Sequence, residues 1–141
     1  MSAEQNKSIV RRWVENGWNE QNVALIDELF TPDFVQHEPG APLPVSNIEE
    51  LKLFVNAYLT ALPDTHFVID DLFAEGDKVV WRFTVTGTHN GALFGIPATG
   101  TRAQVTGIII FRLVGSKMAE AWLNLDTLGM LQQIGVIPVN A

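Results

Sequence analysis

Four strand-like segments follow one another in the second half of the sequence and constrain the fold more than any other feature. They cover residues 65–74, 78–89, 101–114 and 117–126. Turns at residues 75–77 and 115–116, and a glycine-rich loop at residues 90–100, separate them. Consecutive strands joined mostly by tight turns pair antiparallel. We therefore expect a strongly curved, mostly antiparallel sheet.

Helical patterns precede these strands. Apolar residues recur at helical spacing over residues 3–17, 22–30 and 47–62, and Asn47 with Glu50 resembles a capping pair. Between the second and third patterns lie a short extended piece at residues 34–37 and a proline-rich loop. Helices grouped before strands predict an α+β fold in which the helices cover one face of the sheet. We expect one domain over residues 1–141.

Composition excludes several classes of function. The 141 residues carry nine basic and sixteen acidic side chains, and a formal net charge of -7 argues against nucleic acid as a partner. Cysteine is absent and the three histidines are scattered, so we expect no metal. The glycine-rich loop leads into a strand rather than a helix, which does not suit a nucleotide cofactor. No apolar run has the length of a signal peptide or membrane span, so we expect a cytoplasmic protein without membrane contact.

A row of polar side chains on the last strand is the strongest functional signal. Strand residues alternate between faces, so one face carries Met118, Glu120, Trp122, Asn124 and Asp126. Two carboxylates, an indole and an amide suit the wall of a ligand pocket. Asp126 has two interpretations, which the pattern leaves open. It either caps the helix expected over residues 127–135 or acts as a general acid/base.

Aromatic side chains are the expected surroundings of that row. Trp81, Trp13 and Trp18 could wall a cavity in which desolvation raises the pKa of a carboxyl toward the range of a general base. His37 and His89 are further candidates. His37 lies in the pocket or on the surface, and His89 either contacts the substrate or forms a structural bond to its loop. Each of the two central strands carries one arginine, which faces solvent or an interface if it has no role at the site.

Short motifs spread along the chain carry a resemblance to a known family. They read V-Q-H-E-P at 35–39, L-P-D at 62–64, E-G-D-K-V at 75–79, G-T-H-N-G at 87–91, G-I-P-A-T-G at 95–100 and E-A-W-x-x-x-D at 120–126. In this order they resemble the SnoaL-like polyketide cyclases, also called ester cyclases. The resemblance implies a cone-shaped barrel of the nuclear transport factor 2-like type, with a deep pocket between helices and sheet.

The resemblance also implies an activity. Characterised cyclases of this family close the last ring of a polyketide ester by intramolecular aldol condensation, without metal or cofactor. By motif, the catalytic aspartate matches Asp126 and a pocket histidine matches His37. A second pocket histidine has no counterpart, and Arg112 lies in that neighbourhood, where it could contact the substrate. The ligand would be a hydrophobic carbonyl compound.

Two alternatives use the same pocket. One is a non-catalytic domain that binds a small molecule. The other is an epoxide-hydrolase-like enzyme, for which Arg82 or Arg112 could supply the arginine, although no second aspartate lies on a neighbouring central strand. Aliphatic residues on both faces of the third and last strands further predict a homodimer through the outer sheet face, as does the resemblance.

Overall fold

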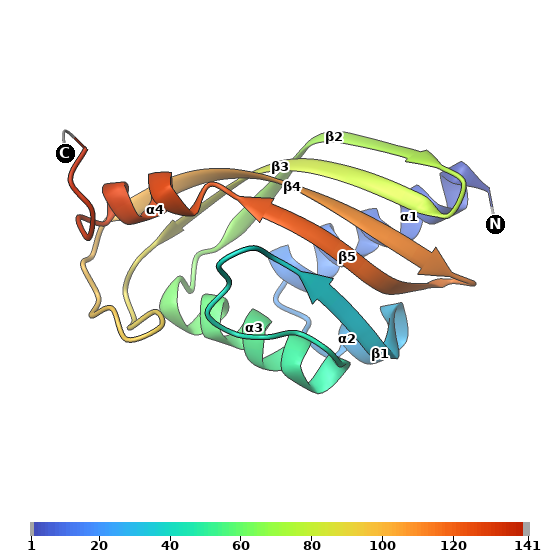
Figure 1. Ribbon diagram of the computed structural model, residues 1–141, viewed down its shortest axis with the longest axis horizontal. Helices are drawn as coiled ribbons and strands as arrows, with labels where there is room; N and C mark the ends of the chain where they lie inside the picture. Colours follow the sequence, from blue (N-terminus) through green and yellow to red (C-terminus); the bar gives the residue numbers. More distant parts are fainter. Residues whose placement is uncertain (1, 140–141) are drawn as a thin grey trace.

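A curved five-stranded sheet forms the centre of the computed structural model, which describes residues 2–139 (Figure 1). Its strands are β1 (Phe30–His37), β2 (His66–Glu75), β3 (Lys78–Thr88), β4 (Arg102–Val114) and β5 (Lys117–Leu125). Their order across the sheet is β1-β5-β4-β3-β2. β2 to β5 pair antiparallel in chain order, whereas β1 joins the edge parallel to β5. The expected α+β fold with a curved, mostly antiparallel sheet is confirmed.

The helices that precede the strands pack on one side of this sheet. They are α1 (Ala3–Arg12), the π-helix η1 (Trp13–Asn19), α2 (Leu25–Leu29) and α3 (Ile48–Ala61), and α4 (Thr127–Gln133) follows the last strand. α1 and η1 pack against β2, and α3 packs against β1. As Figure 1 shows, α3 runs beneath the β1 edge. None of the helices in the described part of the chain is both long and apolar enough to cross a membrane.

Local sequence signals explain where most helices begin. The Asn47 side chain accepts a hydrogen bond from the Glu50 backbone N–H at 2.8 Å, as the capping pair predicted. Ser2 and Gln5 form a reciprocal capping box at the start of α1. The wider turn of η1 then brings Trp13 and Trp18 to the same side, with ring centroids 5.9 Å apart.

Two boundaries differ from the sequence predictions. The second helix occupies only Leu25–Leu29, and Phe30 already begins β1, four residues before the expected extended piece. The interval between Phe30 and Val35 contains a register shift against β5. Proline has no N–H to donate to a neighbouring strand. Pro32 is tolerated because β1 is an edge strand, which has a neighbour on one side only. The helical spacing of the sequence thus extends to Phe30, but pairing with β5 makes this residue part of a strand.

Alternation along the strands separates a core face from an outer face. On β3 and β4 the inward side chains include Trp81, Phe83, Ile109 and Phe111, all buried. The outward side chains are mostly threonine, charged or aliphatic. The core therefore lies between the concave sheet face and the helices.

Candidate functional site

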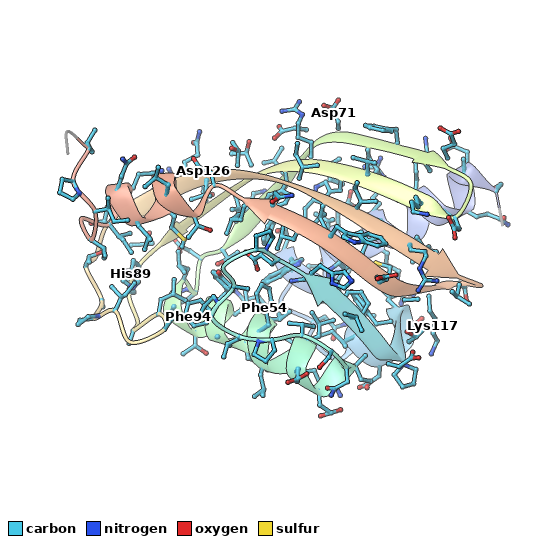
Figure 2. All side chains as sticks on the ribbon, viewed as in Figure 1. Phe54, Asp71, His89, Phe94, Lys117 and Asp126 are labelled. Carbon is cyan, nitrogen blue, oxygen red and sulfur yellow. The ribbon has the colours of Figure 1, made fainter. Side chains whose placement is uncertain are left out.

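An apolar cavity of about 90 Å³ lies between the inner sheet face and the helices. Aromatic rings from the helices and from β2 and β3 make up much of its wall: Trp13, Trp18, Phe54, Phe67, Trp81 and Phe83. Figure 2 shows Phe54 reaching from α3 toward the sheet. β5 contributes Leu123 and Leu125, and α4 contributes Met130. The cavity is suited to a flat, hydrophobic ligand.

The indole N–H of Trp81 is a polar group in this otherwise apolar wall. Its ring packs against Phe83 and Phe67, with centroids 4.7 and 5.3 Å apart. Trp81 is 2% exposed, and its Nε1 is buried without a hydrogen-bond partner among residues 2–139. A buried donor left unpaired carries a desolvation penalty that a ligand oxygen would remove. Trp81 and Trp13 both lie in the cavity wall, and their contact with a ligand stays a prediction.

Three polar residues gather at the β1 and α3 side of the cavity. Gln36 and Tyr58 line it, and Glu38 follows Gln36 by two residues. Burial raises the pKa of the Glu38 carboxyl, whose Oε1 is buried with no hydrogen-bond partner in the described chain. Burial, and next the charge of Glu38, raise the pKa of Tyr58. Tyr58 therefore keeps its proton at neutral pH and can donate a hydrogen bond.

The polar row of β5 lies on the opposite face. Leu123 pairs with Ile109, and both line the cavity, whereas Trp122 pairs with Ile110 on the outside. Glu120 and Asn124 share that outer face with Trp122. Glu120, Trp122 and Asn124 do not line this cavity, and their contact with a substrate stays a prediction. Met118, expected in the same row, is instead buried in the core, because the register against β4 shifts between Met118 and Glu120. The aliphatic face of the strand is the one buried, as the hydrophobic effect favours.

His37 and Arg112 also lie on the outer face, around Glu120. His37 Nε2 is 2.7 Å from Glu120 Oε2, and Arg112 Nε is 3.1 Å from Glu120 Oε1. The His37 ring stacks on Trp122 with centroids 5.6 Å apart. The hydrogen bond from His37, followed by that from Arg112, holds the pKa of Glu120 below its usual range. Neither His37 nor Arg112 lines the apolar cavity, because strand alternation turns both outward, and a role of either at a substrate stays a prediction.

Asp126 lies at the junction of β5 and α4, as Figure 2 shows. Its Oδ1 accepts a hydrogen bond from the Gly129 backbone N–H at 2.9 Å, which makes it the cap of α4. The side chain is exposed and is not among the residues that line the cavity. The capping interpretation is confirmed. The acid/base role of Asp126 stays a prediction.

His89 is buried in the loop that connects β3 to β4, where Figure 2 labels it. Its Nδ1 lies 3.0 Å from Thr99 Oγ1, and its backbone bonds to Thr101 and Gly100. These bonds hold the two ends of the loop together. His89 is not part of the cavity wall, so its observed contacts are those of the structural alternative.

Gln36, Glu38 and Tyr58 were missed by the sequence reasoning. Tyr58 lies within the helical pattern of residues 47–62, where an aromatic side chain is typical of the core, and in V-Q-H-E-P the histidine is the residue that usually indicates chemistry. The alternation of the extended piece was the available signal, because the core residue Phe34, then Gln36 and Glu38, occupy every second position.

Within residues 2–139, no three His, Asp or Glu side chains converge as a metal-binding group.

Comparison with known proteins gives one family. The sequence matches the family described as SnoaL-like polyketide cyclase over residues 8–134. Among proteins with curated functions, none matches significantly.

Solved structures agree with that family. A candidate SnoaL-like polyketide cyclase from Jannaschia sp. CCS1 has 26% identity and a TM-score of 0.87, with 96% of this chain and 95% of that chain covered. A candidate polyketide cyclase from Acidithiobacillus ferrooxidans has 30% identity and a TM-score of 0.83, with 95% and 97% covered. AclR, a candidate hydroxylase from Streptomyces galilaeus, has 29% identity and a TM-score of 0.85, with 97% and 85% covered.

Proposed function

The chain belongs to the SnoaL-like polyketide cyclase family, and from this we propose that it binds a hydrophobic carbonyl compound in its aromatic cavity and promotes a cofactor-independent, cyclase-like acid/base reaction on it. Family membership supports a cyclase-like or related function. The observation that carries the proposal is the unpaired Trp81 N–H in the wall of an apolar cavity. A carbonyl oxygen is the ligand group that would pair with it.

The size of the cavity narrows the ligand. A cavity of about 90 Å³ leaves no room for several fused rings. We therefore favour a compound with one aromatic or alicyclic ring over a fused polycyclic one. A β-keto ester with one ring meets the limit on size and also supplies a carbonyl oxygen for the Trp81 N–H, because it is compact and carries two carbonyl oxygens.

The proposed reaction is an intramolecular aldol condensation. A base removes a proton from the carbon between two carbonyls, and the resulting enolate carbon attacks a further carbonyl of the same molecule. The new alkoxide then takes a proton. Low polarity around the cavity would strengthen each hydrogen bond to the enolate oxygen.

A non-catalytic binding domain is the second candidate. It is favoured by the composition of the wall, since no carboxylate, imidazole, lysine or arginine from residues 2–139 lines the cavity. The epoxide-hydrolase-like alternative has less support. Arg82 pairs with Asp71 at 2.6 Å and Arg112 pairs with Glu120, both outside the cavity.

Ligand binding can be tested with ethyl benzoylacetate, an aromatic β-keto ester, by the change in tryptophan fluorescence. Leu123→Phe fills part of the cavity and is expected to weaken binding at least tenfold. Leu128→Phe is the matched control, because Leu128 is exposed on α4. Equal binding by both variants and the parent would place the ligand elsewhere and refute the proposal.

We also propose a homodimer through the outer sheet face. The apolar side chains of Phe73 and Ile108 are 58% and 47% exposed on that face. A second copy of the chain would cover this apolar surface. Light scattering tests the idea, with Phe73→Asp expected to convert dimer to monomer. A monomeric parent at high concentration would contradict it.

A further inference from the structure

The cavity needs a base that its own wall does not provide. Tyr58 is the one titratable side chain among the described residues that line it. Because burial keeps the Tyr58 phenol protonated, it can donate a hydrogen bond but cannot remove a proton from carbon. The proton acceptor must therefore come from a group beside the wall.

Resting on the proposed function, we infer that Glu38 is the general base of this cavity and that Tyr58 holds the carbonyl oxygen of the substrate. Both residues lie at the same side of the cavity, where the chain leaves β1 and passes α3. Glu38 is close enough to Tyr58 for its charge to act on the phenol.

The position of Glu38 follows from the alternation of β1. Phe34 lies in the core and Gln36 lines the cavity, and Glu38, with a buried Oε1, takes the next place in that spacing, one residue past the end of β1. His37, between them, points outward to Glu120. In the V-Q-H-E-P motif the Glu38 carboxylate is thus shielded from solvent, whereas the neighbouring His37 imidazole lies on the outer sheet face.

The environment of the Glu38 carboxylate suits proton transfer. Its Oε1 is shielded from solvent, and no donor among residues 2–139 satisfies it. Burial raises the pKa of this carboxyl, which makes the carboxylate a stronger base than an exposed glutamate. Other carboxylates near the fold's polar clusters are already engaged: Glu120 with His37 and Arg112, and Asp126 with the Gly129 N–H.

The proton balance closes with these two groups. The Glu38 carboxylate takes the proton from the carbon between the two carbonyls, and the electrons of the C–H bond move into the enolate. Tyr58 donates a hydrogen bond to the enolate oxygen without losing its proton. After the enolate carbon has formed its bond to a third carbonyl of the same molecule, the Glu38 carboxylic acid returns the proton to the alkoxide.

Deuterium exchange at the carbon between the carbonyls of ethyl benzoylacetate isolates the first step. It is followed by NMR in D₂O, with the binding affinity measured separately by fluorescence. Glu38→Gln keeps the size of the side chain and is expected to reduce protein-dependent exchange about 10²-fold, with affinity within about twofold of the parent. Tyr58→Phe is expected to reduce exchange about tenfold. Glu75→Gln, the same change at an exposed position, is expected to exchange at the parent rate.

Each outcome decides between the two proposals. Parent protein that binds and exchanges, with Glu38→Gln inactive and still folded by circular dichroism, supports the assignment. Exchange that survives in Glu38→Gln but is lost in Asp126→Asn overturns it in favour of Asp126. Parent protein that binds without exchange also overturns it and leaves a binding domain. Parent protein without binding refutes the proposed function itself.

Discussion

His37 Nε2 lies 2.7 Å from Glu120 Oε2 on the sheet face turned away from the cavity. Arg112 contacts the other carboxylate oxygen of Glu120. The three side chains connect three strands, since β1 supplies the histidine, β5 the glutamate and β4 the arginine. The His37–Glu120 pair joins the parallel edge strand β1 to the antiparallel part of the sheet. Its expected contribution is therefore to stability rather than to chemistry in the cavity.

Glu120→Gln tests that contribution through pH. His37 and Arg112 lower the pKa of the Glu120 carboxyl, so its stabilising effect is present above the unfolded pKa and is lost as pH falls through the folded pKa. The parent should melt above Glu120→Gln at pH 7, and the difference should shrink below about pH 4. Thermal unfolding across pH measures this. A constant difference at all pH values would contradict the assignment.

Glu38→Gln should show the opposite sign. Burial raises the pKa of Glu38, so the parent has this contribution in full below the unfolded pKa and loses it as pH rises through the folded pKa. Glu38→Gln should therefore be at least as stable as the parent at pH 7, and any advantage should disappear in acid. Denaturant unfolding at pH 3.5 and pH 7, values that bracket about pH 4.3, provides the comparison. A variant less stable only at neutral pH would argue that the carboxylate is well solvated.

Trp81→Phe should discriminate between ligands with and without a carbonyl group. The indole N–H is expected to contribute about 0.5–1.5 kcal/mol to a ligand carbonyl, or up to about tenfold in affinity. Butylbenzene, which accepts no hydrogen bond, serves as the control for the volume lost with the indole. Equal losses for butylbenzene and ethyl benzoylacetate would show that Trp81 contributes packing alone.

Gly17→Ala should destabilise the fold through Trp13. A Cβ atom at Gly17 would clash with the Trp13 ring at Cε3, so the ring must move out of its place in the cavity wall. Overpacking of this kind costs about 1–3 kcal/mol. Denaturant unfolding measures it, with Ser8→Ala at an exposed position of α1 as the control. A parent-like midpoint for Gly17→Ala would mean that the Trp13 ring is mobile.

Asp126→Asn and Asp126→Ala separate the cap from any chemistry. Asparagine is as good a cap as aspartate, so Asp126→Asn should stay within about 1 kcal/mol of the parent, whereas alanine should lose about that amount. Thermal unfolding of the two variants provides the measurement. Equal stability of Asp126→Ala and the parent would show that the Gly129 bond contributes little.

Much of the fold could be predicted from local patterns. The cap at Asn47, the helix after it and the limits of the four long strands needed only spacing and turn residues, which act over a few positions. The parallel pairing of β1 with β5 could not be predicted in this way. It joins His37 to Trp122, residues that no local rule connects.

The site was predicted less well, for a specific reason. Alternation divides β5 into two faces, but it does not say which face meets the helices. The polar row was assigned to the pocket because Glu120 and Trp122 suggested chemistry, whereas burial placed Leu123 inside. Trp13 and Trp81 do line the cavity, because each lies on the apolar side of an amphipathic segment and that side is the one buried.

The π-helix gives the cavity a property that depends on chain length. Residues five apart in an α-helix point about 140° away from each other, at about 100° per residue, so Trp13 and Trp18 could not both face inward from regular α-helix. Removing one residue between them would leave the two indoles four positions apart, about 40° from each other on a regular α-helix, so the wide turn of η1 is what keeps both on one side at their present spacing. The π-helix thus accommodates one additional residue in the chain without removing either indole from the cavity wall, which makes η1 a place where the length of the chain can change while the wall is kept.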